Sequence, residues 1–358
     1  MGTPIRRIAV FRALMLGDLL CATPALRALR HHHPDAEITL VGLPWARGLA
    51  QRLASVDRFV EFPGWPGLPE QPITDWRALP GFLAAMRAQR FDLALQLHGS
   101  GRIVNPLVAA FEARRSAGFA SPAASGPPGN EARFIRWPRH GTEVERLLTL
   151  TDHLGAPRHG TALDFPLRDT DRDAADRLCA PLRGRRFAIV HAGAQLPSRR
   201  WPVERFAAVA DALAREGLEI VLTGSAAEAG LTRAVAAAMR APALDLAGRT
   251  SLWSLGALVE WSTQVVCNDT GISHVAAALH TPSVVVSSGG DAIRWAPSDR
   301  ARHQVLWHDL PCRPCSHVRC PHGQACALGV GVGEVRTLAL AALRTTRTEP
   351  LEDGVVHA

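Results

Sequence analysis

Residues 264–287 read QVVCNDTGISHVAAALHTPSVVVS, and this stretch contains a complete strand–helix–strand unit. The apolar run at 264–267 predicts a buried strand, residues 271–280 predict a helix, and residues 283–287 predict a second buried strand. Strands that are apolar throughout are typical of a parallel sheet, because helices cover both of its faces. The stretch therefore predicts an α/β fold.

The same alternation continues on both sides of this stretch and falls into two blocks. In the first block we expect strands at 8–11, 37–42, 58–62 and 92–97, and helices at 46–53, 82–90 and 142–154, with a further helix that follows a turn at 16–18 and ends before Pro34. In the second block we expect strands at 187–191, 218–223, 264–267 and 283–287, and helices at 203–216, 228–239, 252–260, 271–280 and 335–344. Residues 63–80 and 118–131 are rich in Gly and Pro and are expected to form loops, and an extended linker begins at Phe165.

The two blocks predict two domains with a cleft between them. We place the first domain at residues 1–165, the second at 166–335, and a last helix with a tail at 336–358. A chain of 358 residues with 47% hydrophobic residues can supply two cores. Ligands of open α/β sheets bind at the carboxyl ends of the strands, so the residues that follow strands are the candidates for a site.

The charge of the chain excludes some classes of partner. The net charge is +7, every basic residue of the Lys/Arg class is Arg, and no run of five or six arginines occurs. A basic surface suits an anionic partner, whereas scattered arginines argue against binding of nucleic acid. No apolar stretch of about 18 residues is present, and the amino-terminal apolar run leads into Gly17 and Asp18 rather than to a cleavage site. We therefore expect a cytoplasmic protein without a transmembrane helix.

Asp18 follows the first expected strand, where the first helix begins. The carboxylate could cap that helix. It could also lie at the mouth of the cleft and take a proton from a hydroxyl group. The surrounding residues do not form the Gly-rich pattern G-x-G-x-x-G, which disfavours a nicotinamide-dependent oxidoreductase.

Two adjacent arginines, Arg199 and Arg200, follow the strand expected at 187–191. Paired N–H donors at the junction of a strand and a helix suit a phosphate group. A solvated basic turn would give the same pattern. Glu228 follows the next strand, where it could accept hydrogen bonds from a ribose diol or occupy the first turn of a helix.

Residues 268–274 read NDTGISH and open a helix directly after a strand. The first N–H groups of a helix lack partners, and the helix dipole is positive there, so Thr270 and Gly271 could present donors to a diphosphate. Asn268 or Asp269 could also serve as the cap of this helix. His274 is either a hydrogen-bonded core residue or a ligand contact.

Four cysteines, Cys312, Cys315, Cys320 and Cys326, cluster near the end of the chain. In a cytosolic protein such a cluster can form a structural metal site. The spacing does not match the paired C-x2-C pattern of zinc ribbons, so reduced thiols or a disulfide are the alternatives.

Four motifs together resemble one family: GDLLCATPALRALR at 17–30, HAGA at 191–194, RRWP at 199–202 and NDTGISHVAAALHTPSVVV at 268–286. RWAP at 294–297 and the CRPC run add to the likeness. These motifs resemble the ADP-heptose:lipopolysaccharide heptosyltransferases, glycosyltransferase family 9, over roughly residues 5–345. The resemblance implies a GT-B fold, in which two Rossmann-like domains with parallel sheets face across a cleft and the last helix packs back toward the N-terminal domain.

The resemblance also implies roles for individual residues. The first domain would bind the acceptor and the second the nucleotide sugar, in an inverting transfer of heptose from ADP-heptose to a lipopolysaccharide core. Asp18 matches the catalytic base, and Arg199 stands where the family usually has a Lys that contacts the donor phosphate. The remaining implied contacts are Arg200, Glu228, Asp269, Thr270, Gly271 and His274 for the donor, and His98 and Arg102 for the acceptor.

The resemblance requires no cofactor and no divalent metal, since the helix start and the arginines would stabilise the leaving diphosphate. A lipid-linked acceptor would go with peripheral contact at the inner membrane. One alternative is a GT-B transferase that uses another nucleotide sugar for a different surface glycan. Another is an inactive nucleotide-binding homologue, against which the presence of Asp18 counts.

Overall fold

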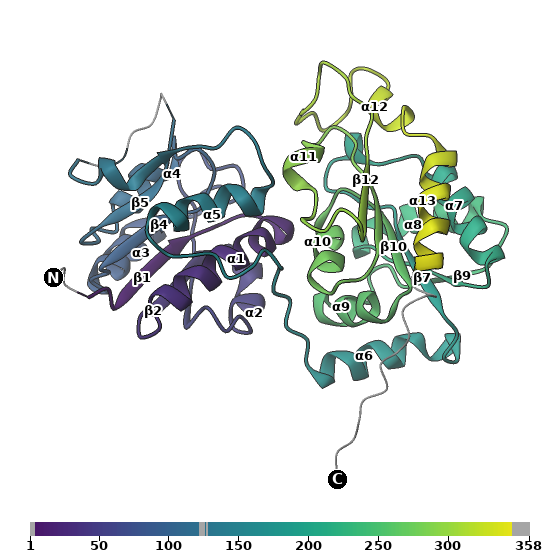
Figure 1. Cartoon of the computed structure of the whole chain (residues 1–358), viewed down its shortest axis with the longest axis horizontal. Helices are drawn as coiled ribbons and strands as arrows, with labels where there is room; N and C mark the ends of the chain where they lie inside the picture. Colours follow the sequence, from purple (N-terminus) through teal and green to yellow (C-terminus); the bar gives the residue numbers. More distant parts are fainter. Residues whose placement is uncertain (1–3, 122–125, 127, 346–358) are drawn as a thin grey trace, which may run out of the picture. The chain divides into compact units, whose positions relative to one another are not determined.

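The computed structural model describes residues 4–121, 126 and 128–345 (Figure 1). The chain divides into two compact units, Met1–Pro166 and Leu167–Ala358. The division falls next to the boundary expected at residue 165.

The first unit is built on a six-stranded sheet in the order β3-β2-β1-β4-β5-β6, in which every strand pair is parallel. The strands are β1 (Arg7–Phe11), β2 (Glu37–Gly42), β3 (Arg58–Glu61), β4 (Leu93–Gln96), β5 (Ser116–Ala120) and β6 (Phe134–Arg136). The helices are α1 (Leu16–His32), α2 (Arg47–Ala50), α3 (Ala78–Ala88), α4 (Val104–Ala109) and α5 (Glu143–His153), and α1 packs on α5.

The second unit repeats this plan with the order β12-β11-β10-β7-β8-β9, again with parallel pairs only. The strands are β7 (Phe187–His191), β8 (Glu219–Leu222), β9 (Ala243–Asp245), β10 (Gln264–Asn268), β11 (Ser283–Val286) and β12 (His303–Leu306). The helices are α6 (Asp169–Cys179), α7 (Val203–Arg215), α8 (Ala229–Ala238), α9 (Leu252–Trp261), α10 (Gly271–Ala278), α11 (Ala292–Trp295), α12 (Ala325–Leu328) and α13 (Val332–Thr345). Among the described residues, no helix combines the length and the hydropathy that crossing a membrane requires.

Both strand orders reverse direction once, and the reversal fixes where a ligand can bind. Connections from β1 and β4 leave toward opposite edges of the first sheet, and those from β7 and β10 do the same in the second. The carboxyl ends of such strand pairs form the crevice in which open α/β sheets hold ligands. We call the ends of β1 and β4 the first switch point, and the ends of β7 and β10 the second.

Burial explains why the central strands were easy to predict. Ile8, Val10 and Phe11 of β1 are fully buried, and the ring of Phe11 meets the edge of Phe62 at 5.0 Å between centroids. In the second unit Val266 of β10 and Val284 of β11 are fully buried in one apolar core with residues of α7 and α13. A strand buried on both faces contains a nearly continuous apolar run, which is the pattern that the sequence shows at 8–11 and 284–286.

The sequence prediction missed several elements at the sheet edges. β6, β9 and β12 are short and only partly buried, so they carry few apolar residues, and α4, α6, α11 and α12 were not expected either. Residues 118–120 belong to β5 rather than to the loop expected at 118–131, of which residues 122–125 and 127 lie outside the described part of the chain. The helix α1 already begins at Leu16, so residues 16–18 form its first turn instead of preceding it.

The last helix, α13, packs into the core of the second unit. Val335, Ala339 and Leu343 of α13 are buried in the core of the second unit, against α7, β10 and β11. The amide nitrogen of Gln264 in β10 donates to the carbonyl oxygen of Ala339 at 3.0 Å. The apolar face of α13 is therefore buried in the second unit, and its expected packing toward the N-terminal domain stays a prediction. The tail expected after it, residues 346–358, lies outside the described residues.

Candidate functional site

Asp18 lies at the first switch point, as the third residue of α1. The residue at the cap position is Met15, which makes no side-chain cap bond, so Asp18 is not the N-cap residue of α1. A carboxylate in the first turn still interacts favourably with the positive end of the helix dipole. The side chain of Asp18 is 21% exposed, which leaves it within reach of solvent and of a bound molecule.

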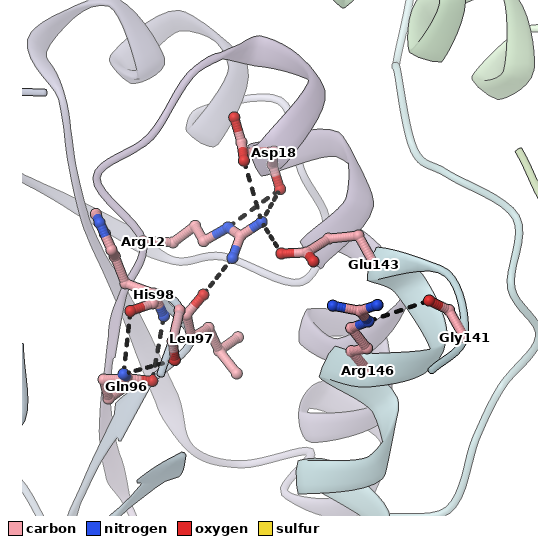
Figure 2. A network of polar contacts seen from close by, with 9 residues as sticks. Arg12, Asp18, Gln96, Leu97, His98, Gly141, Glu143 and Arg146 are labelled. Carbon is pink, nitrogen blue, oxygen red and sulfur yellow. Dashed lines mark hydrogen bonds and ion pairs between the residues drawn. The ribbon is translucent and has the colours of Figure 1, made fainter. Parts of the chain in front are cut away.

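Arg12 follows β1 and is the centre of a polar network beneath Asp18 (Figure 2). Its Nε and Nη2 donate to the main-chain oxygen of Asp18 at 3.1 and 2.8 Å, and its Nη1 donates to the main-chain oxygen of Leu97 after β4. Nη2 also donates to Oε1 of Glu143, the first residue of α5, at 3.0 Å. The side chains of Arg12 and Glu143 are completely buried.

His98 lies at the other side of the first switch point, two residues after the end of β4. Its ring stacks on Phe11 at 5.4 Å between centroids, and its buried Nδ1 has no hydrogen-bond partner within the described residues. Burial and, to a lesser extent, the positive charge of Arg12 lower the pKa of His98 to about 3, against a small opposing effect of Glu143. His98 is therefore a neutral imidazole at physiological pH, suited to hydrogen bonding with a bound molecule and not to carrying charge.

Arg102 lies in the exposed turn that follows His98. The turn is held in place by Gly101, which has a φ of +84°, and a Cβ atom there would lie 2.3 Å from the oxygen of Phe119. The side chain of Asn105 donates to the same oxygen at 3.0 Å. The structure therefore places His98 and Arg102 in one tightly constrained turn at the carboxyl end of the first sheet.

Asn268 closes β10 at the second switch point and is completely buried. Its Nδ2 donates to the oxygen of Ala192 at 2.8 Å, and its Oδ1 accepts from the main-chain N–H of Trp201 at 2.9 Å. Asn268 thus ties the end of β10 to the loop that follows β7. It does not cap α10, and neither does Asp269, because the cap position belongs to Thr270.

Asp269 points into a polar cluster beside that loop. Oδ2 accepts from the hydroxyl group of Ser287 at 3.0 Å, and Gly290 lies so close that a Cβ atom there would be 2.8 Å from the same oxygen. Burial, with a smaller contribution from Asp291, raises the pKa of Asp269, although Ser287, Arg199 and Arg313 act in the opposite direction. A carboxyl group of this kind favours its proton more than an exposed aspartate does.

Arg199 belongs to the same cluster. Its Nη2 donates to the main-chain oxygen of Cys315 at 3.1 Å, while its buried Nε has no hydrogen-bond partner within the part of the chain that the structure describes. The main-chain N–H of Cys315 donates to the oxygen of Gly289 at 2.8 Å. A buried donor without an acceptor costs about 1–3 kcal/mol, so Arg199 is well placed to gain from a bound anion.

Glu228 lies in the first turn of a helix, which is one of the two roles considered for it, and its contact with a ribose diol stays a prediction. Its Oε2 accepts from the N–H and hydroxyl groups of Ser225 at 2.9 and 2.8 Å, as the acidic member of a capping box. Its Oε1 lies 4.0 Å from Nη2 of Arg200, and a Cβ atom on Gly193 would lie 2.3 Å from it. Burial alone would raise the pKa of Glu228, but Ser225, His191 and Arg200 together lower it, so the carboxylate is ionised beside the loop after β7.

Helix α10 starts at Gly271 without a side-chain cap. Thr270 is extended, with φ of −155°, and its oxygen accepts from the N–H and hydroxyl groups of Ser273 at 3.0 and 2.7 Å. His274 follows in the first turn; it is buried, and its ring meets the edge of Trp295 at 6.2 Å between centroids. The start of this helix opens at the carboxyl end of β10, where an anion would meet its dipole.

The cysteine cluster forms neither a disulfide nor a compact ligand set. Cys312, Cys315, Cys320 and Cys326 are unpaired thiols. No group of three or more His, Cys, Asp or Glu side chains within the described residues is arranged to hold a metal ion. The main chain of this segment forms hydrogen bonds with Arg199 and Gly289, and the sulfur of Cys315 also lies close to Gly289.

The structure brings most of the predicted residues to the two switch points, each within its own unit. Asp18, His98 and Arg102 gather in the first unit, and Arg199, Arg200, Glu228, Asp269, Thr270 and Gly271 gather in the second. Sequence reasoning missed Arg12, Glu143 and Arg313. A lone Arg that ends an apolar strand, as in RIAVFR, is the signal that could have revealed Arg12.

Comparison with known proteins gives one consistent family. The sequence model of one protein family, glycosyltransferase family 9 (heptosyltransferase), matches residues 81–325. Lipopolysaccharide heptosyltransferase 2 of Salmonella typhimurium is 30% identical over 303 residues, which cover 78% of this chain and 82% of that protein.

Solved structures agree with the fold. A glycosyl transferase family 9 protein from Veillonella parvula superposes with a TM-score of 0.78 at 20% identity and covers 96% of this chain and 99% of that one. E. coli ADP-heptose lps heptosyltransferase II gives a TM-score of 0.71 at 20% identity, with 96% and 100% covered. The expected fold class, GT-B with two Rossmann-like domains, is confirmed.

The lowered pKa of His98 predicts how acid affects stability. Between pH 6.5 and about 3 the unfolded chain takes up a proton at this residue that the folded chain does not, so the free energy of unfolding falls as the pH is lowered through that range. Replacement His98→Gln should reduce this slope by up to about 1.4 kcal/mol per pH unit, the value for one proton. Urea unfolding at a series of pH values measures it, with exposed His140→Gln as control. Equal slopes for wild type and His98→Gln would contradict the prediction.

Proposed function

Because the chain belongs to glycosyltransferase family 9, the heptosyltransferases, we propose that it transfers a heptose from ADP-heptose to a lipopolysaccharide core acceptor with inversion. The name of the Salmonella relative, lipopolysaccharide heptosyltransferase 2, supports the proposed acceptor. The name of the E. coli structure, ADP-heptose lps heptosyltransferase II, supports the proposed donor. The acceptor is lipid-linked, so the proposal places the reaction in the cytoplasm with peripheral contact at the inner membrane. The observation that carries the proposal is that a partly exposed carboxylate occupies one switch point and a cluster suited to phosphate the other.

The first unit supplies the base in this proposal. Asp18 accepts the proton of the acceptor hydroxyl group as its oxygen attacks the anomeric carbon of the sugar. Inversion follows because the attack comes from the face opposite the leaving nucleotide. His98 and Arg102 lie in the turn after β4 of the same unit, where a neutral imidazole and an exposed guanidinium can bind the polar acceptor.

The second unit holds the nucleotide diphosphate. Charge builds up on the diphosphate as the glycosidic bond breaks, and fixed donors that already face it lower the barrier. The N–H groups at the start of α10 and the guanidinium of Arg199 are such donors. Glu228 is ionised and can accept hydrogen bonds from the ribose diol, whereas the raised pKa of Asp269 reduces its repulsion of the phosphates.

The donor sugar is tested with a panel of ADP-, GDP- and UDP-sugars. Transfer should be fastest with ADP-heptose on a heptose-deficient lipopolysaccharide core, which is read out as ADP release and as a mass increase of the acceptor. Faster transfer from a GDP- or UDP-sugar would replace the proposed donor with the alternative nucleotide sugar, and binding without turnover for every donor would indicate an inactive homologue.

Replacement Asp18→Asn tests the base. The amide keeps the size of the side chain but cannot accept the proton, so kcat should fall by about 10²–10⁴-fold. The affinity for ADP should stay within twofold of wild type by calorimetry, because ADP binds to the other unit in this proposal. Exposed Asp35→Asn in the same unit serves as the control and should keep full activity. Near-wild-type transfer by Asp18→Asn would remove Asp18 from the chemistry.

Replacement Arg199→Ala tests the phosphate contact. Loss of hydrogen bonds from a charged donor should weaken ADP binding by about 10–100-fold, measured by titration calorimetry. Arg199→Lys, which restores the charge but not the fork of N–H groups, should recover part of the affinity. Arg240→Ala, at an exposed position between α8 and the edge strand β9, is the matched control. An unchanged affinity in Arg199→Ala would show that Arg199 does not contact the nucleotide.

A further inference from the structure

We propose that Arg12, held by Glu143, is the positioning residue of the catalytic base Asp18. The inference rests on the proposed role of Asp18 and adds two buried residues to it. Neither Arg12 nor Glu143 is needed to contact the donor or the acceptor. Their effect on the reaction passes through the main chain that carries Asp18 (Figure 2).

The guanidinium group of Arg12 joins segments that are far apart in the sequence. Arg12 itself is anchored to β2, since its main-chain N–H donates to the oxygen of Val41 at 3.0 Å. Its side chain then bonds to Asp18 in the first turn of α1, to Leu97 at the end of β4, and to Glu143 at the start of α5. One rigid, planar group thus fixes the three segments that meet at the first switch point.

The contact with Asp18 is made mainly through the main chain. Two nitrogens of Arg12 donate to the main-chain oxygen of Asp18, whereas the distance from Nη2 to Oδ1 of its carboxylate is 3.8 Å. This arrangement sets where the third residue of α1 lies while the carboxylate keeps 21% exposure. The same guanidinium also bonds to the oxygen of Leu97, the residue before His98. It therefore fixes the position of Asp18 relative to that of His98.

Glu143 accounts for the orientation of Arg12. The two side chains are completely buried, and their nitrogen and oxygen lie 3.0 Å apart. Burial of an ion pair gains little stability over apolar residues of similar volume, because both charges lose their hydration. A buried pair therefore calls for another explanation, and the geometry points to the placement of the base. A displacement of about 1 Å at a reacting group can cost about 10²-fold in rate.

The decisive variant replaces the pair with apolar residues of similar size, Arg12→Met together with Glu143→Leu. If the pair only stabilised the fold, the folded double variant would turn over substrate as fast as the wild-type protein. The inference expects a folded protein whose melting temperature is lowered only by the loss of the hydrogen bonds from Arg12 to the oxygens of Asp18 and Leu97. Its affinity for ADP should stay within twofold of wild type, and its kcat should be 30-fold or more below wild type. Wild-type kcat in the folded double variant would overturn it.

A second set of variants keeps the test valid if the double variant does not fold. Arg12→Lys retains the charge beside Glu143 but cannot bond to Asp18 and Leu97 together, and kcat should fall at least tenfold with KM for the donor unchanged. Glu143→Gln retains an oxygen acceptor for Arg12 and should keep most of the activity, whereas Glu143→Ala should not. Wild-type kcat in a folded Arg12→Lys variant, or equal losses in Glu143→Gln and Glu143→Ala, would contradict the inference.

Failure of this inference can be told apart from failure of the proposed function. In the Asp18→Asn background, Arg12→Lys should cause no further loss of kcat, because the residue acts through Asp18. Active Asp18→Asn would overturn the role of Asp18 and the inference with it. Inactive Asp18→Asn combined with fully active Arg12→Lys would overturn the positioning role alone.

Discussion

The order in which the strands join is the constraint on which the candidate site depends. In each unit the chain fills the sheet from the middle toward one edge and then from the middle toward the other. Helical connections therefore leave β1 and β4, and likewise β7 and β10, on opposite sides, and the ends of these strands stay accessible. Asp18 and His98 follow the first pair of strands, and Arg199 and Asp269 follow the second pair. In both units, the candidate site residues therefore lie where the strand order leaves room for a ligand.

The sequence predicted the parts of the fold in which local pattern and burial agree. Central strands such as β1 and β10 contain an apolar run, at 8–11 and 265–267, because both of their faces are covered. The residues after these runs were found because polar groups interrupt the pattern. The strands β9 and β12 lie at the sheet edges, where half-buried residues give no such pattern. The partners of a buried charge are also invisible to local pattern, since Arg12 and Glu143 are 131 positions apart and meet only when α1 packs on α5.

The two units handle charge in different ways. In the first unit, the buried guanidinium of Arg12 pairs with the buried carboxylate of Glu143. The same guanidinium donates hydrogen bonds to the main-chain oxygens of Leu97 and Asp18. In the second, Arg199 keeps a buried Nε without a partner within the described residues, and a raised pKa makes Asp269 favour its proton. The first arrangement suits a rigid support for a base. The second leaves positive charge to be matched by an anion, as binding of a diphosphate requires.

The cysteine segment acquires a role once its main chain is considered instead of its thiols. The oxygen of Cys315 accepts from Arg199, its N–H donates to Gly289, and the oxygens of His317 and Val318 accept from the side chain and main chain of Ser198. The segment thus supports the loop after β7 and the loop after β11 together. A lysine at position 199 has a single ammonium group on a flexible stem, whereas the planar fork of an arginine can hold the oxygen of Cys315 and still direct further N–H groups toward a phosphate. An arginine at position 199 is therefore matched to this supporting segment.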